Sequence, residues 1–190
     1  MCVDMKMKVS LRDQLKQHTL QSHQQLEQSL DILGQGWTSE RYVQLLQKFA
    51  VFHVEFEQQL REFPTVWPFY QSRLKTPLLR EDLPSMPEEG STEVRQFLAT
   101  QLQEEADAWG LLYVIEGSTH GGQVLTRHFE KLVGERSRYF ASYGADVVSQ
   151  WQRFVATLDA RPFSEREVAR AVRSAERLFQ FFLGYLPVTT

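Results

Sequence analysis

The sequence predicts an all-α fold in a single domain. Strand signals are nearly absent, because no run of alternating β-branched residues occurs and no Asn-Gly or Asp-Gly pair marks a hairpin. Apolar residues instead recur at steps of three and four, as they do on one face of an amphipathic helix. A chain of 190 residues is long enough to bury a core. We therefore expect a tail at residues 1–10 and one helical domain over residues 11–187.

The first half of the chain predicts two long helices and then an irregular connection. The helices are expected over residues 9–33 and 39–60. The second has a wide apolar stripe, formed by Tyr42, Leu45, Leu46, Phe49, Phe52, His53, Phe56 and Leu60. Residues 61–91 contain five prolines and an acidic cluster, which predicts an irregular segment with one short helix.

The second half predicts four further helices, over residues 92–116, 117–133, 143–158 and 163–186. The start of the last helix is marked by Ser164 and Glu167, which have the spacing of a capping box. Apolar residues follow on one face of that helix, as expected for a helix that packs on a core.

Composition excludes several classes of function. The formal net charge of −3 argues against a nucleic-acid-binding surface, which needs an excess of Lys and Arg. The single cysteine, Cys2, permits no disulfide framework and favours a reducing compartment. The N-terminus lacks the apolar stretch of a signal peptide, and no run approaches the roughly eighteen apolar residues of a membrane span. We expect a cytoplasmic protein without a membrane span.

A histidine and a carboxylate share one face of the first predicted helix. His23 and Glu27 are four residues apart, so their side chains can meet. A carboxylate that accepts the second N–H of an imidazole orients the other ring nitrogen toward a metal. His18 lies about 140° around the helix from His23 and cannot chelate with it. A surface His–Glu pair is the competing interpretation.

Three glycines interrupt the apolar pattern of 110-GLLYVIEGSTHGGQVL-125. Gly117 and Gly121 are four residues apart and open a strip of bare backbone, which Gly122 widens. Close helix packing, a kink and contact with a flat apolar cofactor all account for such a strip. A phosphate-binding loop does not fit, because no strand precedes the glycines and no Lys-Ser/Thr pair follows them.

Two more His–Glu pairs occur at helical spacing. His53 with Glu57 falls on the apolar stripe of residues 39–60, and Glu116 with His120 falls within the glycine-rich stretch. These pairs make a di-iron carboxylate oxidase on the same helical scaffold an alternative, although the usual Glu-x-x-His spacing and a full set of six ligands are missing. The residues also fit a heme site. One helix carries a histidine that could bind the iron, and another exposes glycine backbone, so the two helices could hold a porphyrin between them.

On these residues the sequence resembles the heme oxygenase family. The stretch 15-LKQHTLQSHQQLE-27 is similar to the family's proximal helix, in which a Thr precedes the heme-ligating His by four residues and an acidic residue follows it by four. Those positions are Thr19, His23 and Glu27 here. The stretch Gly121–Leu125, GGQVL, is similar to the family's distal helix. Residues 143–154 and 175–182 also match, so the resemblance covers about residues 11–186.

The resemblance implies an all-α fold with heme b between the first helix and a kinked distal helix. Heme would be both cofactor and substrate, and O₂ the co-substrate. The implied products are biliverdin, CO and iron, with electrons supplied by a ferredoxin, a flavodoxin or a reductase. His23 would be the axial iron ligand, backed by Glu27.

The remaining site residues follow from the same resemblance. Gly117, Gly121 and Gly122 would lie on the distal face of the heme. Arg153 and Lys16 would neutralise the heme propionates, with Arg138 or Arg127 as alternatives to Arg153. Many members have an Asp where this chain has Ser118, so its proton relay would use Ser118, Thr119, backbone carbonyls and water.

His120 is a second departure from the family pattern. A position at the edge of the pocket, proton delivery to bound oxygen and a second axial ligand are the three interpretations that remain open for it. Together, Ser118 and His120 leave a non-catalytic heme-binding protein as an alternative to the enzyme. A thiamin-degrading relative would need a nucleophilic cysteine on a core helix, and Cys2 in the tail cannot serve.

Overall fold

The computed structural model describes residues 10–31, 33–134 and 136–187, so Cys2 and most of the expected tail lie outside the described residues. Over these ranges the fold is all-α and contains no strand, as the sequence predicts. The elements are α1 (Leu11–Leu30), α2 (Ser39–Leu60), α3 (Trp67–Tyr70), α4 (Thr76–Asp82), α5 (Thr92–Gln101), α6 (Glu105–Val133), α7 (Arg138–Ala141), a 3₁₀ turn (Gly144–Asp146), α8 (Val147–Asp159) and α9 (Glu165–Tyr185).

The predicted bounds of the two helices around α6 are wrong. The helix expected over residues 92–116 is divided into α5 and α6 at Leu102, because Asp107 accepts hydrogen bonds from the backbone N–H groups of Gln103 and Glu104 and so starts a new helix. The helix expected over residues 117–133 is the continuation of α6, which runs for 29 residues through all the glycines. Packing of α6 against its neighbours outweighs the low helix propensity of glycine.

The proline-rich segment also forms more helix than expected. It contains both α3 and α4, and each begins with a proline in its first turn, Pro68 and Pro77. Proline is tolerated there because the first backbone N–H groups of a helix have no partner within the helix. The rest of the segment is irregular, as predicted.

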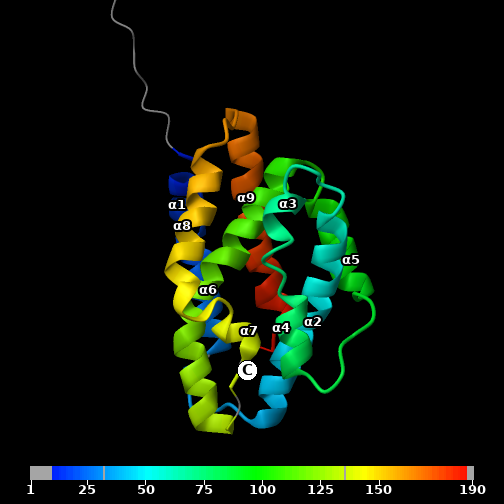
Figure 1. Ribbon diagram of the computed structural model, residues 1–190, viewed down its shortest axis with the longest axis vertical. Coiled ribbons are helices and arrows are strands. Elements are labelled where there is room, and N and C mark those ends of the chain that lie inside the picture. The colour runs from blue at the N-terminus through cyan, green and yellow to red at the C-terminus, as the bar shows by residue number, and fades with distance from the viewer. Residues whose placement is uncertain (1–9, 32, 135, 188–190) are drawn as a thin grey trace, which may run out of the picture.

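Helix α9 is central to the packing and contacts both α1 and α6 (Figure 1). The backbone of α9 at Ala171 lies so close to Gly110 of α6 that a Cβ at Gly110 would collide with it. At the same contact, Ser174 donates a hydrogen bond to Asp107, 2.9 Å away. One end of α6 is therefore fixed tightly on α9.

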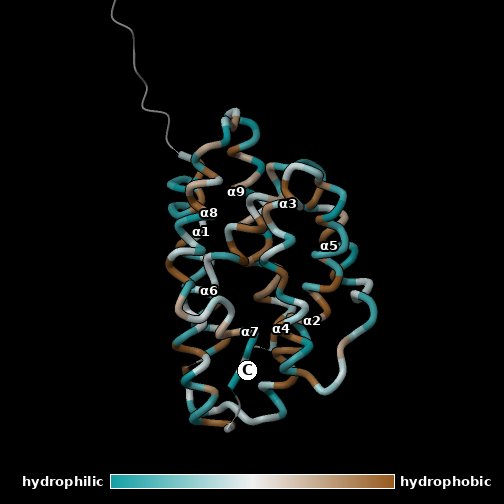
Figure 2. Tube along the Cα trace, in the orientation of Figure 1, coloured by the Kyte–Doolittle hydropathy of each residue, from teal (hydrophilic) through white to brown (hydrophobic). Residues whose placement is uncertain are grey.

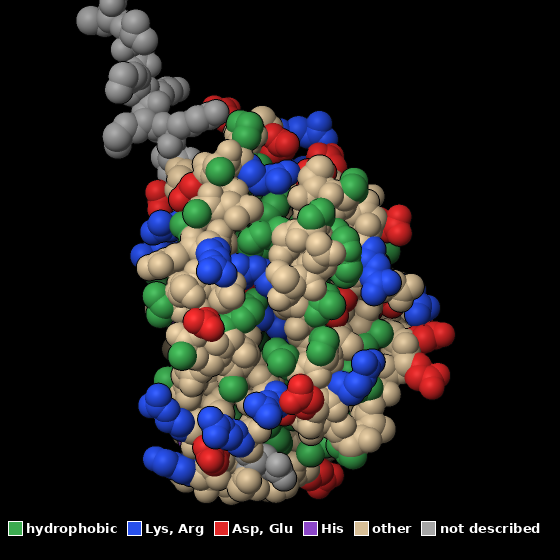
Figure 3. Space-filling model, in the orientation of Figure 1, with side chains coloured by type: hydrophobic (Ala, Val, Ile, Leu, Met, Phe, Trp, Pro, Cys, Tyr) green, Lys and Arg blue, Asp and Glu red, His purple; other side chains and the backbone are tan. Residues whose placement is uncertain are grey.

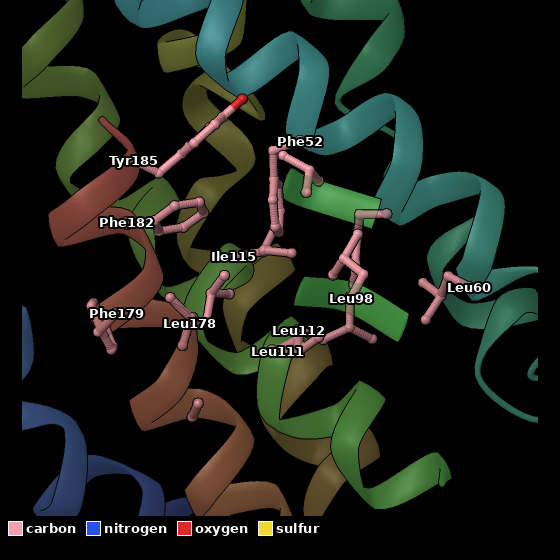
Figure 4. Close-up of a cluster of buried hydrophobic side chains, with 14 of the residues drawn as sticks. Phe52, Leu60, Leu98, Leu111, Leu112, Ile115, Leu178, Phe179, Phe182 and Tyr185 are labelled. Carbon is pink, nitrogen blue, oxygen red and sulfur yellow. The ribbon is translucent and has the colours of Figure 1, made fainter. Parts of the chain in front are cut away.

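The core lies where α2, α6 and α9 meet, and Figure 4 shows side chains from these helices turned toward one another. Phe182 of α9 packs edge-on against Phe52 of α2, with ring centroids 4.9 Å apart. Apolar residues concentrate along this interior, whereas the connection between α4 and α5 is more polar (Figure 2). Within the described ranges, none of the helices combines the length and apolar character that crossing a bilayer requires.

Candidate functional site

A cavity of about 650 Å³ lies between α1 and α6. Its remaining walls come from α2, α7 and α9, which supply mostly aromatic side chains. Among the residues that line it are His23, Glu27, Phe49, His53, Lys75, Gly117, Ser118, His120, Gly121, Gly122, Tyr139, Phe140, Ser142, Phe179 and Phe182. The two stretches singled out in the sequence, on α1 and α6, therefore face the same space.

The α1 wall carries His23 and Glu27. The Nδ1 atom of His23 lies 3.6 Å from a carboxylate oxygen of Glu27, and both side chains are exposed to solvent or to the cavity. The ring of His23 stands edge-on to Phe179 of α9, with centroids 5.7 Å apart. His18 faces elsewhere: its Nδ1 lies 3.8 Å from Glu176, and it does not line the cavity. Of these two histidines, only His23 can meet a ligand in the cavity.

The α6 wall contains all three glycines, but for different reasons. A Cβ at Gly121 would meet nothing within 4 Å, and one at Gly117 would make an ordinary contact with Trp151, 3.8 Å away. These two positions leave bare backbone that packing does not require. Gly122 lines the cavity too, yet a Cβ there would collide with the backbone carbonyl of Phe140 in α7. The close approach of α7 explains Gly122.

The residues between the glycines differ in exposure. Ser118 is exposed, and its hydroxyl donates to the carbonyl of Ile115, 2.8 Å away. Thr119 is buried and donates to the carbonyl of Glu116 at 2.6 Å. His120 is exposed at the edge of the cavity and stands edge-on to Trp151 of α8, with centroids 5.2 Å apart.

The basic residues expected at the propionates do not line the cavity. Lys16 and Arg153 are exposed on α1 and α8, two helices that pack on each other. Of the two alternatives, Arg127 is exposed on α6 and Arg138 forms an ion pair with Glu81 at 3.2 Å.

His53 and Glu57 make hydrogen bonds to different parts of the structure. The Nε2 atom of His53 lies 3.1 Å from the hydroxyl of Tyr139, while Glu57 accepts hydrogen bonds from the backbone N–H groups of Lys75 and Thr76 at 2.6 and 3.1 Å. Burial, aided by the charge of Lys75, lowers the pKa of His53 to about 3. Burial also raises the pKa of Glu57. His53 is therefore a neutral residue of the inner wall.

Glu116 turns away from His120 into a buried ion pair. Its carboxylate lies 2.5 Å from the guanidinium of Arg73 and accepts from the hydroxyl of Tyr143 at 2.8 and 3.0 Å. The ammonium of Lys75 lies 3.8 Å away. Neither His–Glu pair is thus free to bind metal, and among the described residues no group of three or more His, Cys, Asp and Glu side chains could hold an ion. The predicted di-iron ligand pairs are not brought together.

Several cavity residues have no counterpart among the predicted ones. Lys75 precedes α4 in the proline-rich segment, and Tyr139 and Ser142 belong to α7 and the residue after it. Asp82, at the end of α4, positions this part of the wall by accepting from the backbone N–H groups of Arg138 and Tyr139 at 2.7 and 2.9 Å. None of these residues lies on a periodic apolar pattern, so only the acidic cluster at Glu81 and Asp82 could have indicated a contact here.

Comparison with known proteins adds a family and a fold. A family model described as heme oxygenase matches residues 9–186. A heme oxygenase of Xanthomonas campestris pv. campestris (strain 8004) is 33% identical over 159 residues, which cover 80% of this chain and 93% of the relative.

Solved structures agree on the fold. The heme oxygenase of Leptospira interrogans superposes with a TM-score of 0.79 at 18% identity, covering 93% of this chain and 98% of that one. Heme oxygenase-1 of the cyanobacterium Synechocystis sp. PCC6803, solved in complex with heme, superposes with a TM-score of 0.75 at 18% identity and covers 94% and 91% of the two chains.

Proposed function

The chain belongs to the heme oxygenase family, enzymes that degrade heme, and from this premise we propose that it cleaves heme b with O₂ to biliverdin, CO and ferrous iron. The observation that supports the proposal most strongly is that His23 and the bare backbone of Gly117 and Gly121 line one cavity, from α1 and from α6. We propose that residues 11–187 form the heme oxygenase domain.

The cavity fits heme in size and in chemistry. Its volume of about 650 Å³ is within the range of small-molecule and cofactor sites. Aromatic side chains such as Phe49, Phe179 and Phe182 offer apolar contact to a porphyrin ring, and an imidazole is a common axial ligand of heme iron. When bound, heme would supply the iron at which O₂ is reduced and the ring carbon that is oxidised.

The α1 wall would bind the iron. His23 is the candidate axial ligand because it is the histidine of α1 that lines the cavity. Glu27 would accept a hydrogen bond from the other ring nitrogen and so select the tautomer, while Phe179 limits rotation of the imidazole. The 3.6 Å separation of His23 and Glu27 needs only a small side-chain adjustment to become a hydrogen bond.

The α6 wall would keep the opposite face of the ring open to a small molecule. Gly117 and Gly121 allow the backbone to approach the ring, and Gly122 allows α7 to close the side of the cavity. Ser118 and Thr119 donate to carbonyls of their own helix, so their hydroxyl oxygens remain able to accept hydrogen bonds from water and would hold a proton-carrying water in place. His120 would act at the edge of the cavity.

The heme carboxylates would lie at the opening of the cavity. Lys16 and Arg153 are both exposed, on helices that pack side by side, so their long side chains could reach propionates that extend out of the cavity. A guanidinium at Arg153 would bind a carboxylate through two parallel hydrogen bonds.

Electrons would come from a ferredoxin, a flavodoxin or a reductase. Lys and Arg side chains gather on the face shown in Figure 3 over the C-terminal part of α6 and α7, where Arg127, Lys131, Arg136 and Arg138 are exposed. This part of α6 follows directly on the cavity residues Val124 and Leu125. A basic surface beside the cavity would attract an acidic electron carrier, with an affinity that falls as salt rises.

Adding hemin to the purified protein, and then reduced ferredoxin in air, tests the proposal. The expected result is an intense Soret band that decays into the broad absorption of biliverdin, with release of CO. A Soret band that persists would indicate a heme-binding protein without turnover. Absence of the band would contradict the proposal.

Replacing two histidines separately tests the iron ligand. His23→Ala should remove the native axial coordination and change the ferric and ferrous-CO spectra. His18→Ala is the matched control, because His18 lies on the same helix but outside the cavity. The opposite result would mean that the assignment of His23 is wrong.

A further inference from the structure

The inner wall of the cavity contains a buried lysine. The side chain of Lys75 is only 3% exposed, yet it lines the cavity, so the surface that it shows faces the ligand space. Its ammonium donates a hydrogen bond to the hydroxyl of Ser142, 3.1 Å away, and lies 4.1 Å from the centre of the Tyr143 ring. Ser142 lines the same cavity and is half-buried.

Groups of both charges face Lys75. The charged and titratable groups that face it come from α2, from the residues before α4, from α6 and from the residues after α7, namely His53, Glu57, Arg73, Glu116 and Tyr143. Glu116 already forms a closer ion pair with Arg73, at 2.5 Å against 3.8 Å to Lys75. Loss of the Lys75 proton therefore leaves the Arg73–Glu116 pair intact.

Burial is the main reason that the Lys75 ammonium loses its proton more readily than an exposed lysine does. It lowers the pKa of Lys75 to about 8, with the charge of Arg73 acting in the same direction and the charges of Glu116 and Glu57 opposing it. An amine with such a pKa is charged at neutral pH and still releases its proton readily.

Ser142, whose hydroxyl accepts the hydrogen bond from Lys75, has an unusual backbone conformation. Ser142 has φ 43° and ψ −109°, a region that residues other than glycine seldom adopt. The backbone N–H of Ser142 donates to the carbonyl of Arg138, and this hydrogen bond closes the last turn of α7. The hydroxyl of Ser142 is thereby placed within reach of Lys75. Strained residues of this kind are enriched at functional sites.

We propose that Lys75 is a catalytic proton donor of the cavity, with Ser142 as the hydroxyl that returns the proton from solvent. In the donating step an N–H bond of the ammonium breaks and an O–H bond forms on an oxygen acceptor in the cavity, which leaves a neutral amine. The amine then takes a proton from the Ser142 hydroxyl as that hydroxyl takes one from water. This role rests on the proposed function, and it supplies the fixed acid that Ser118 cannot.

The test compares Lys75→Met with Lys48→Met as the matched control, because Lys48 of α2 also lies over a tyrosine ring, 4.2 Å from the centre of Tyr185, but does not line the cavity. Met keeps the length of the side chain and removes its charge, and Glu116 retains Arg73 and Tyr143 as partners, so Lys75→Met should fold. In the protein without heme, the ¹³Cε and ¹⁵Nζ resonances that disappear in Lys75→Met should titrate near pH 8. Titration at pH 10 or above would overturn the proposal.

The second measurement uses fluoride as a probe of cationic donors beside ferric heme. Lys75→Met should bind hemin as the wild type does, but its ferric complex should bind fluoride about tenfold more weakly, since a nearby positive charge in a protein interior has at least that effect. Turnover should fall by about a hundredfold, as expected when a general acid is removed. Lys48→Met should change neither quantity.

The two ideas fail in different ways. If hemin gives no Soret band with the wild type, the proposed function is overturned and the role of Lys75 with it. If hemin binds and both fluoride affinity and turnover are the same in Lys75→Met, only the role of Lys75 is overturned.

Discussion

Three histidines stand at different depths in the cavity wall, and depth decides what each can do. His53 is 2% exposed and is held neutral, whereas His23 has 47% of its side chain exposed and His120 lies at the edge. A neutral buried imidazole can donate or accept one hydrogen bond at each nitrogen but carries no charge. His53 accordingly supports Tyr139, while His23 remains available to a ligand.

The burial of His53 predicts a pH dependence of stability. Its pKa is about 3 in the folded chain, against 6.5 in the unfolded chain. The unfolded chain therefore binds the proton first, so this contribution is complete above pH 6.5 and is lost as the pH falls toward 3. Over that window the loss is on the order of 4 kcal/mol.

Urea denaturation of the protein without heme at several pH values measures this effect. His53→Gln keeps an amide that can bond to Tyr139 but removes the titrating group, so its free energy of unfolding should fall less steeply between pH 6.5 and 4. Parallel slopes for the two proteins would show that the imidazole is not desolvated as described.

Replacing His120 should have little effect on hemin binding. Its ring is exposed and contacts Trp151 edge-on, so His120→Leu should change the hemin dissociation constant by less than about twofold. The ferric spectrum should also keep its spin state. A shift from low to high spin in this variant would instead identify His120 as a second axial ligand.

At the scale of elements, α6 combines glycines that packing requires with glycines that it does not. Gly110→Ala and Gly122→Ala each drive a methyl group into the backbone of a neighbouring helix, so each should lower the free energy of unfolding by about 1–3 kcal/mol. Gly121→Ala meets no atom within 4 Å, so it should stabilise the protein without heme by up to about 1 kcal/mol.

Hemin affinity distinguishes the two classes of glycine. Gly121→Ala should weaken hemin binding although it stabilises the fold, because its methyl group occupies the space left for the ring. Soret titrations beside thermal melts of the three variants measure both quantities. Unchanged hemin affinity in Gly121→Ala would place the ring elsewhere.

Most long helices could be predicted because their apolar residues repeat with the helical period. The start of α9 was also readable, since Ser164 and Glu167 form the capping box that their spacing predicts. The break before α6 was not predicted, because the N-cap residue of its capping box is Glu104, in place of Ser or Thr, with Asp107 as the third residue of the helix. The sequence also could not show that packing requires glycine at positions 110 and 122, because that depends on which helix lies against each one.

At the scale of the whole molecule, one buried ion pair joins segments that are distant in sequence. Arg73 follows α3, Glu116 belongs to α6, and the guanidinium also donates to the carbonyl of Gln150 in α8 at 3.2 Å. The proline-rich segment is thereby tied to α6, which lines the cavity, and to α8. Helical periodicity carries no information about such a contact, so Lys75, Tyr139 and Ser142 could not be predicted as cavity residues.

This ion pair predicts strong coupling between its members. Glu116→Gln leaves Arg73 buried without a carboxylate and should cost about 3–5 kcal/mol of stability. Arg73→Met with Glu116→Met should cost less than the sum of the two single changes, and a double-mutant cycle in urea measures the difference. Additive effects would contradict the description of a desolvated pair.

The shortness of α7 has a consequence for how a ligand gains access. Only four residues long, it depends on Asp82 and on the Ser137 side chain to bind its amides, where α6 has a ladder of its own. Its local opening should therefore require much less free energy than global unfolding. Amide hydrogen exchange at Tyr139 and Phe140 is expected to be faster than in α6 and to slow when hemin binds. Such a result would identify α7 as the part of the cavity wall that opens to admit the ligand.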